Sequence, residues 1–224
     1  TSNSISVNPA DFIKLISYIM LAIMVLSKTG IEDFNFNVDF RLLSALFLSY
    51  LIPIVMYHNK EKYSVNDAFY LIAGLIFVGM SFNLLILIRN TSLEYLIYLF
   101  LITIITDTYA YFTGSLIGKT KLLESISPNK TWEGSIGGTI FGVLVGSVFY
   151  HVVIDASLPI YVVVLMTLFL SIIGQFGDLV FSAIKRYFGK KDFSNIMPGH
   201  GGILDRLDSI IFVMLGFMFF ISII

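Results

Sequence analysis

The chain has 224 residues, of which 57% are hydrophobic and only 13% are charged. Because soluble domains carry roughly 25% charged residues, this composition indicates an integral membrane protein. The absence of cysteine excludes disulfides, thiolate metal sites and cysteine nucleophiles, and the net charge of -1 gives no sign of a nucleic acid partner.

Seven apolar stretches are long enough to cross a bilayer, because a hydrocarbon core of roughly 30 Å needs about 20 helical residues. We predict an all-α fold, a polytopic transmembrane helix bundle with a polar cavity open to the cytoplasmic side. Residues 1–92 would form N-terminal helices and residues 93–224 the catalytic region of one membrane domain. The predicted spans are 11–28, 38–57, 66–88, 93–113, 133–154, 158–188 and 203–224.

Basic residues gather in alternate connections between these spans. Connections rich in Lys and Arg face the cytoplasm under the positive-inside rule, so the second, fourth and sixth connections are predicted to be cytoplasmic. They hold Lys60, Lys62, Lys119, Lys121, Lys130, Lys185, Arg186, Lys190, Lys191 and Arg206, whereas the other connections hold Lys28, Arg41 and Arg89.

A polar stripe lies on the sixth predicted span, in GQFGDLVFSAIKRYFGKKD. Asp178, Ser182 and Lys185 recur at i, i+4 and i+7, the spacing of one helical face. A charge near the bilayer centre costs roughly 3 kcal/mol or more, so Asp178 is interpreted as functional. The alternative is an ion pair of Asp178 with Lys185 that only locks the helix.

Two carboxylates share a face where the last span begins. Asp205 and Asp208 are i, i+3 neighbours in ILDRLDS. This pattern suits Mg²⁺, which takes carboxylate oxygens and bridges to substrate phosphates. The alternative is a helix N terminus, where the dipole favours acidic residues. Asp107, flanked by threonines in TIITDTYAYFTG, is a third acidic candidate, although those threonines could simply bond back to their own helix.

The connection 114–132 is basic and leads into the fifth predicted span. Lys119 and Lys121 have two equally good interpretations: they attract anionic lipid at the membrane surface, or they belong to the functional site. Lys130 lies just before a predicted helix N terminus, where an immobilised cation can hold phosphate oxygens, and Glu133 follows it.

Glycines mark two further segments. A small-xxx-small face predicts close helix packing, within the bundle or between subunits, and it consists of Gly134, Gly138, Gly142 and Gly146. In PGHGG, residues 198–202, the glycines could form a flexible hinge, but glycine also lets backbone N–H groups approach phosphates. His200 could be an acid or base, a phosphate donor or a structural group, and the sequence leaves these open.

The sequence combines acidic residues that suit a metal, basic loops and a glycine-rich segment, all beside a predicted membrane cavity. This combination favours phosphoryl or nucleotidyl transfer onto a lipid head group. No Walker loop or kinase glycine-rich loop is present in the sequence.

The segment SAIKRYFGKKDFSNIMPGHGGILDRLDS closely resembles the C-terminal motif of the phosphatidate cytidylyltransferases. TDTYAYFTGSLIGKTKL and ISPNKTWEGSIGG are similar to that family's central segments, with Met197 and Tyr109 as departures from its usual residues. The matched motif positions are Ser182, Lys185, Arg186, Lys191, Asp192, His200, Gly201, Gly202, Asp205, Arg206 and Asp208.

The resemblance implies that CTP and phosphatidic acid react to give CDP-diacylglycerol and pyrophosphate. It also implies Mg²⁺, with a second metal or a monovalent cation left open, a homodimer, and a multi-pass place in the bacterial inner membrane. By motif position, the catalytic residues would be Asp178, Lys185, Asp205 and Asp208, with Asp178 and Asp205 as metal ligands. The substrate-binding residues would be Asp107, Lys130, Glu133, Ser182, Arg186, Lys191, Asp192, His200, Gly201 and Arg206.

Two alternatives stay open. A CTP-dependent polyprenol or phytol kinase would share the basic face but should lack the full order of KR, KD, HGG and DRxD. An ion-coupled secondary transporter would use Asp107 and Asp178 as coupling sites, but it predicts repeated halves with broken helices, and the sequence shows no such symmetry.

Overall fold

The computed structural model describes residues 9–26, 40–57, 63–194 and 201–221, with side chains from residues 11 to 220 of these ranges. Within them lie seven α-helices, a π-helical turn and a two-stranded sheet, which confirms the predicted helical bundle. Four helices are long and apolar enough to cross a membrane, namely Val65–Thr91, Leu93–Ile117, Trp132–Ile154 (with its π-helical end) and Ile160–Tyr187. The chain forms two compact units, Thr1–Asn90 and Thr91–Ile224. The predicted division at residue 92 was based on where the motifs lie in the sequence, and it stays a prediction.

The first unit is built from α1 (Pro9–Leu26), α2 (Phe40–Tyr57) and most of α3 (Val65–Thr91). Its core joins apolar side chains of all three helices and the turn before α3. Tyr50 is fully buried there, and its hydroxyl lies 2.7 Å from the hydroxyl of Ser17. The amide of Asn83 donates to the carbonyls of Met24 and Val25 at 3.1 and 3.0 Å, which satisfies acceptors at the end of α1.

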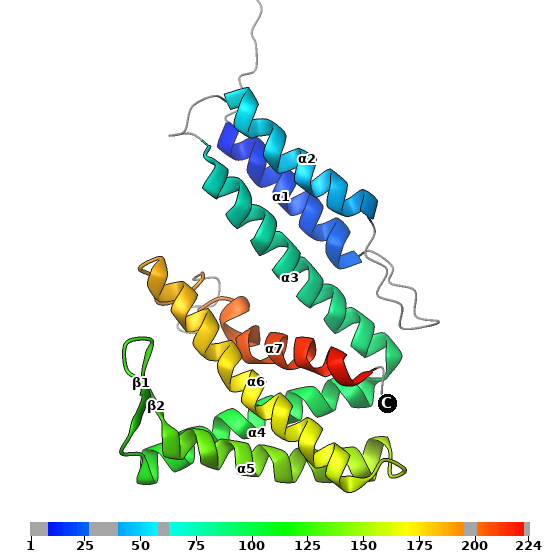
Figure 1. Cartoon of the computed structure of the whole chain (residues 1–224), viewed down its shortest axis with the longest axis vertical. Coiled ribbons are helices and arrows are strands. Elements are labelled where there is room, and N and C mark those ends of the chain that lie inside the picture. The colour runs from blue at the N-terminus through cyan, green and yellow to red at the C-terminus, as the bar shows by residue number, and fades with distance from the viewer. Residues whose placement is uncertain (1–8, 27–39, 58–62, 195–200, 222–224) are drawn as a thin grey trace, which may run out of the picture. The chain divides into compact units, whose positions relative to one another are not determined.

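The second unit contains every segment in which the sequence predicts site residues. Its helices and its hairpin are labelled in Figure 1. The chain runs from α4 into a β-hairpin, then through α5 and a π-helical turn into α6 and α7. Their bounds are α4 Leu93–Ile117, β1 Lys121–Leu123, β2 Ser127–Thr131, α5 Trp132–Phe149, η1 Tyr150–Ile154, α6 Ile160–Tyr187 and α7 Leu204–Ile221. Helix α5 packs against both α4 and α6, and α6 packs against α7.

The glycine face of α5 packs directly on α4. A Cβ added at Gly134 would lie 2.6 Å from the carbonyl oxygen of Ala110, and one at Gly146 would lie 2.9 Å from a side-chain carbon of Ile102. Gly138 and Gly142 would meet atoms of Thr106 at still shorter range. Close packing within the bundle is therefore confirmed for this stripe, because no larger side chain fits between the two helices.

The connection predicted over 114–132 is more structured than expected. Helix α4 continues to Ile117, and β1 and β2 then pair as an antiparallel hairpin. The start of α5 is fixed by Thr131, whose hydroxyl accepts from the N–H of Gly134 at 3.2 Å, and by Glu133, which accepts from the N–H of Thr120 at 3.1 Å. The hairpin is thereby tied to α5, so Lys130 on β2 has a defined position beside the bundle.

Candidate active site

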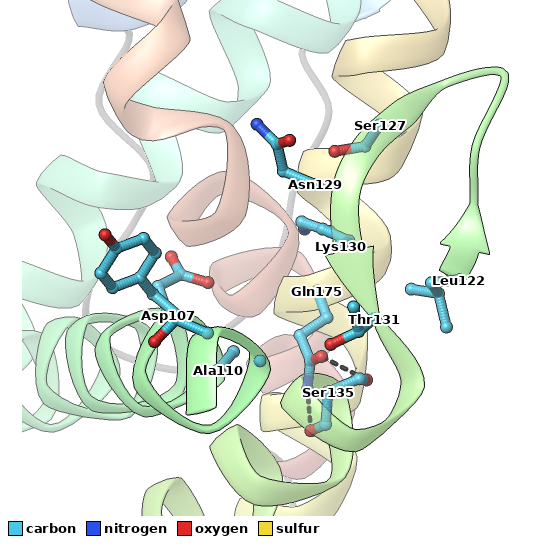
Figure 2. Close-up of a pocket in the computed structure, with 12 residues that line it drawn as sticks. Asp107, Ala110, Leu122, Ser127, Asn129, Lys130, Thr131, Ser135 and Gln175 are labelled. Atoms are coloured by element: carbon cyan, nitrogen blue, oxygen red, sulfur yellow. Dashed lines mark hydrogen bonds between the residues drawn. The ribbon is translucent and has the colours of Figure 1, made fainter. Parts of the chain in front are cut away.

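A polar cavity of about 400 Å³ opens between α4, β2 and the start of α5. Figure 2 shows Lys130 and Asn129 on β2 across the cavity from Asp107 on α4, with Gln175 of α6 below them. Asp107 is exposed to this space. The lining combines a cation, a carboxylate and amide and hydroxyl groups, which suits a polar ligand bearing phosphates. The lining residues are Asp107, Ala110, Tyr111, Gly114, Ser115, Leu122, Ser127, Asn129, Lys130, Thr131, Ser135 and Gln175.

Lys130 joins the hairpin to the polar stripe of α6. Its amine lies 2.5 Å from a carboxylate oxygen of Asp178, and each side chain keeps more than a quarter of its surface exposed. The other carboxylate oxygen of Asp178 accepts from the hydroxyl of Ser182 at 3.3 Å. The alternative pairing of Asp178 with Lys185 is therefore wrong for this structure. Because the pair is accessible, a bound phosphate could share the Lys130 amine.

Three carboxylates lie near one another at this end of the unit. Asp107, Asp178 and Asp208 interact electrostatically with each other, and Lys130 opposes their repulsion. Asp107 and Ser209 also line the same small space, so the start of α7 lies beside the cavity residue of α4. Helices α4, α6 and α7 thus each contribute one of these acidic residues, and their roles in a site stay predictions.

The carboxylate of Asp205 is instead enclosed by hydrogen-bond donors of the protein. We call this cluster of Lys185, Phe193, Gly202 and Asp205 the clasp. One of its oxygens accepts from the Lys185 amine at 2.9 Å, and the other accepts from the N–H groups of Phe193 and Gly202, both at 2.9 Å. The side chains of Lys185 and Asp205 are only 12% and 6% exposed. The Lys185 amine also lies over the ring of Phe193, 5.5 Å from its centroid. The clasp therefore fixes the chain around residue 193 and residue 202 against α6 and α7.

Gly201 is required by the same clasp. Its φ of +78° is a left-handed conformation, and a Cβ there would lie 3.3 Å from oxygens of both Asp192 and Asp205. The glycine thus lets the backbone pass close to the two carboxylates. His200, next to it, lies outside the described residues.

The sequence profile of the cytidylyltransferase family matches residues 4–224. The chain belongs to the cytidylyltransferase family. It is 41% identical to the phosphatidate cytidylyltransferase of Staphylococcus haemolyticus, over 91% of this chain and 79% of that protein. It is also 41% identical to the enzyme of the same name from Staphylococcus saprophyticus, over 79% of this chain and 67% of that protein, and 40% identical to the one from Staphylococcus epidermidis, over 89% and 75%. The resemblance seen in the motifs is confirmed.

The remaining predicted residues of this cytidylyltransferase-family chain lie around the cavity and the clasp rather than at one point. Arg186, Lys191 and Arg206 are exposed, and an Arg186 guanidinium nitrogen lies 3.5 Å from the Lys190 carbonyl. Glu133 serves the start of α5, as described above. Their roles in binding substrate stay predictions.

Gln175 is a site residue that the sequence did not indicate. Its side chain accepts from the Ser135 hydroxyl at 2.5 Å and donates to the Thr139 hydroxyl at 2.8 Å, which ties α6 to α5 at the cavity floor. These contacts are drawn in part in Figure 2. Its place three residues before Asp178, nearly one helical turn away, was the available signal.

The predicted metal ligands fit a divalent cation unequally. Both oxygens of Asp205 are engaged by protein donors, so Asp205 does not offer an open ligand, and its metal role stays a prediction that the geometry does not support. Both oxygens of Asp178 also meet protein donors, Lys130 and Ser182, but its side chain is 30% exposed, compared with 6% for Asp205. Asp178 and Asp208 are therefore the better candidates, since hard cations prefer carboxylate oxygens. Among the described residues, however, no three His, Asp or Glu side chains converge as a ready metal site.

Proposed function

We propose that this chain transfers a cytidylyl group from CTP to phosphatidic acid, giving CDP-diacylglycerol and pyrophosphate. The observation that carries the proposal is the ion pair of Lys130 and Asp178, 2.5 Å apart beside a polar cavity in a membrane bundle of this family. A polar cavity in apolar helices suits the joining of a water-soluble nucleotide to a lipid phosphate.

In the proposed reaction, an oxygen of the lipid phosphate forms a bond to the α-phosphorus of CTP. The bond from that phosphorus to the bridging oxygen breaks, and pyrophosphate leaves with the electron pair. Because a phosphate monoester has a second pKa of about 6, the attacking group is already ionised and needs no strong base. The residues therefore act by positioning and by neutralising charge.

Lys130 is the proposed contact to phosphate oxygens. Its amine has three donors, so it can bond a phosphate and Asp178 together. The buried pair of Lys185 and Asp205 holds the neighbouring chain in place, while the exposed Arg186, Lys191 and Arg206 would draw the anionic substrates to this end of the bundle.

A divalent cation, Mg²⁺ in the cell, is part of the proposal, with Asp178 and Asp208 as the residues that would hold it. When bound, such an ion would neutralise charge on the phosphates. We further propose a homodimer in the bacterial inner membrane, with the cavity on the cytoplasmic side. The orientation is supported by the basic residues at the cavity end, which the positive-inside rule assigns to the cytoplasm.

Pyrophosphate release tests the reaction. Purified protein in detergent should release pyrophosphate only when CTP, phosphatidic acid and Mg²⁺ are all present. A protein that ignores phosphatidic acid but phosphorylates a prenol would instead be a lipid kinase, and the proposed function would fall.

A further inference from the structure

We infer that the groove between α5 and α6 holds an acyl chain of the lipid substrate, from the polar cavity outward along both helices. The inference rests on the proposed function, because it assigns the apolar part of that same substrate. It adds residues that would position the lipid and determine its chain preference.

The stretch of groove nearest the cavity is almost wholly apolar. It has a volume of about 500 Å³ and lies between the hairpin and the two helices. Its walls are formed by Leu123 of β1, Trp132 and Ile136 of α5, and Ile172, Phe176 and Leu179 of α6. A volume of this size is typical of a ligand site rather than of a packing defect.

A second stretch of about 460 Å³ continues the groove along the same helices. Val143 and Leu144 of α5 and Val164 and Leu168 of α6 line it, and Ile140 belongs to both stretches. From Ser135 to Val148 the groove runs roughly 20 Å along α5 at 1.5 Å per residue. One leaflet of the hydrocarbon core is about 15 Å thick, half of roughly 30 Å, so the length suits one acyl chain.

The groove lies directly beside the polar cavity. Leu122, Ser135 and Gln175 line both spaces. The hydrogen bond between Ser135 and Gln175 thus stands where a polar head group would meet its apolar tail. This shared wall favours a lipid over a helix of a second copy, because only an amphiphile would occupy both spaces at once.

The expected effect of the groove is on orientation. An acyl chain leaves one hydrocarbon environment for another, so entering the groove brings little hydrophobic gain. The groove instead fixes the direction of the tail and, through it, the place of the lipid phosphate. Blocking it should therefore impair turnover of long-chain lipids while leaving the phosphate site intact.

Ile140→Trp would block the junction of the two stretches, and Leu165→Trp is the matched control. Leu165 lies on α6, is 61% exposed and does not line the groove. For long-chain phosphatidic acid, Ile140→Trp should lower kcat/KM about tenfold or more, whereas short-chain phosphatidic acid and the control variant should stay near wild type. Equal loss with both lipids, or no loss, would overturn the inference. A change in oligomeric state without chain discrimination would assign the groove to a second copy and overturn it as well.

A second measurement needs no turnover. Phosphatidic acid with a photoreactive group at the acyl end should label the wild-type chain near Leu144 or Leu168. Labelling spread evenly over the exposed face that includes Leu165 would contradict the assignment. A wild type that is labelled in the groove but inactive would refute the proposed reaction and not the groove.

Discussion

Lys130 of β2 and Asp178 of α6 form an ion pair, with 2.5 Å between the amine and the carboxylate, at the wall of the polar cavity. The hairpin therefore places the Lys130 amine against α6, the helix that carries the polar stripe. A hairpin tied to α5 by the contacts of Thr131 and Glu133 keeps that cation in place.

Lys130→Met should lower activity roughly 10²-fold or more, because it removes a charged donor aimed at the reacting phosphates. Lys119→Met, on the exposed approach to the hairpin, is the control and should keep most activity. Steady-state rates at saturating CTP check this. Equal activity of the two variants would refute a phosphate contact by Lys130.

Asp205→Asn should abolish most activity and lower thermal stability, because it leaves the buried Lys185 amine without its counter-charge. Breaking such a pair typically costs about 3–5 kcal/mol. The exposed Glu124→Gln serves as the control. Activity is measured across a range of Mg²⁺ concentrations beside a melting curve. A positioning role predicts no recovery at high Mg²⁺, whereas recovery would favour the metal role expected from sequence.

Comparing Gly201→Ala with Gly189→Ala separates two effects: strain in the backbone, and loss of the close approach of the backbone to the carboxylates of Asp192 and Asp205. Both glycines have positive φ, so each alanine should cost about 1–2 kcal/mol of stability. Only Gly201 lies against the carboxylates of Asp192 and Asp205, since no atom lies within 4 Å of a Cβ at Gly189. Activity should therefore fall for Gly201→Ala alone. A similar fall in both variants would mean that strain, and not the clasp, limits turnover.

Gly138→Leu should reduce the yield of folded protein, because its side chain would strike the Thr106 carbonyl and the Ala110 Cβ, the latter 2.8 Å from the added Cβ. Ile136→Leu, exposed on the same helix, should express normally. Size-exclusion profiles in detergent compare the two. Normal recovery of Gly138→Leu would show that α4 and α5 can separate there.

The chain has no cysteine, so single-cysteine labelling can test its orientation without background. Lys190→Cys lies at the cavity end of α6 and Ser157→Cys in the connection before α6, both exposed. An impermeant maleimide on intact cells should label Ser157→Cys but not Lys190→Cys, and both after permeabilisation. The reverse pattern would place the cavity on the outer side.

The lengths of the apolar runs predicted the helices closely, because the thickness of the bilayer imposes long apolar runs that few other folds need. It did not predict the hairpin, since strands of three and five residues leave little signal beside a polar loop. The stripe of Asp178, Ser182 and Lys185 was correctly placed on one helix, but its partners were not evident. Lys185 pairs with Asp205 because the chain returns from α6 to the start of α7, a contact that spacing along one helix cannot reveal.

The most direct test of the proposed reaction follows the label of CTP into lipid. With phosphatidic acid and Mg²⁺, CTP labelled at the α-phosphorus should give labelled lipid, whereas CTP labelled at the γ-phosphorus should give labelled pyrophosphate and unlabelled lipid. Label from the γ-phosphorus in the lipid, with none from the α-phosphorus, would contradict cytidylyl transfer and identify a kinase.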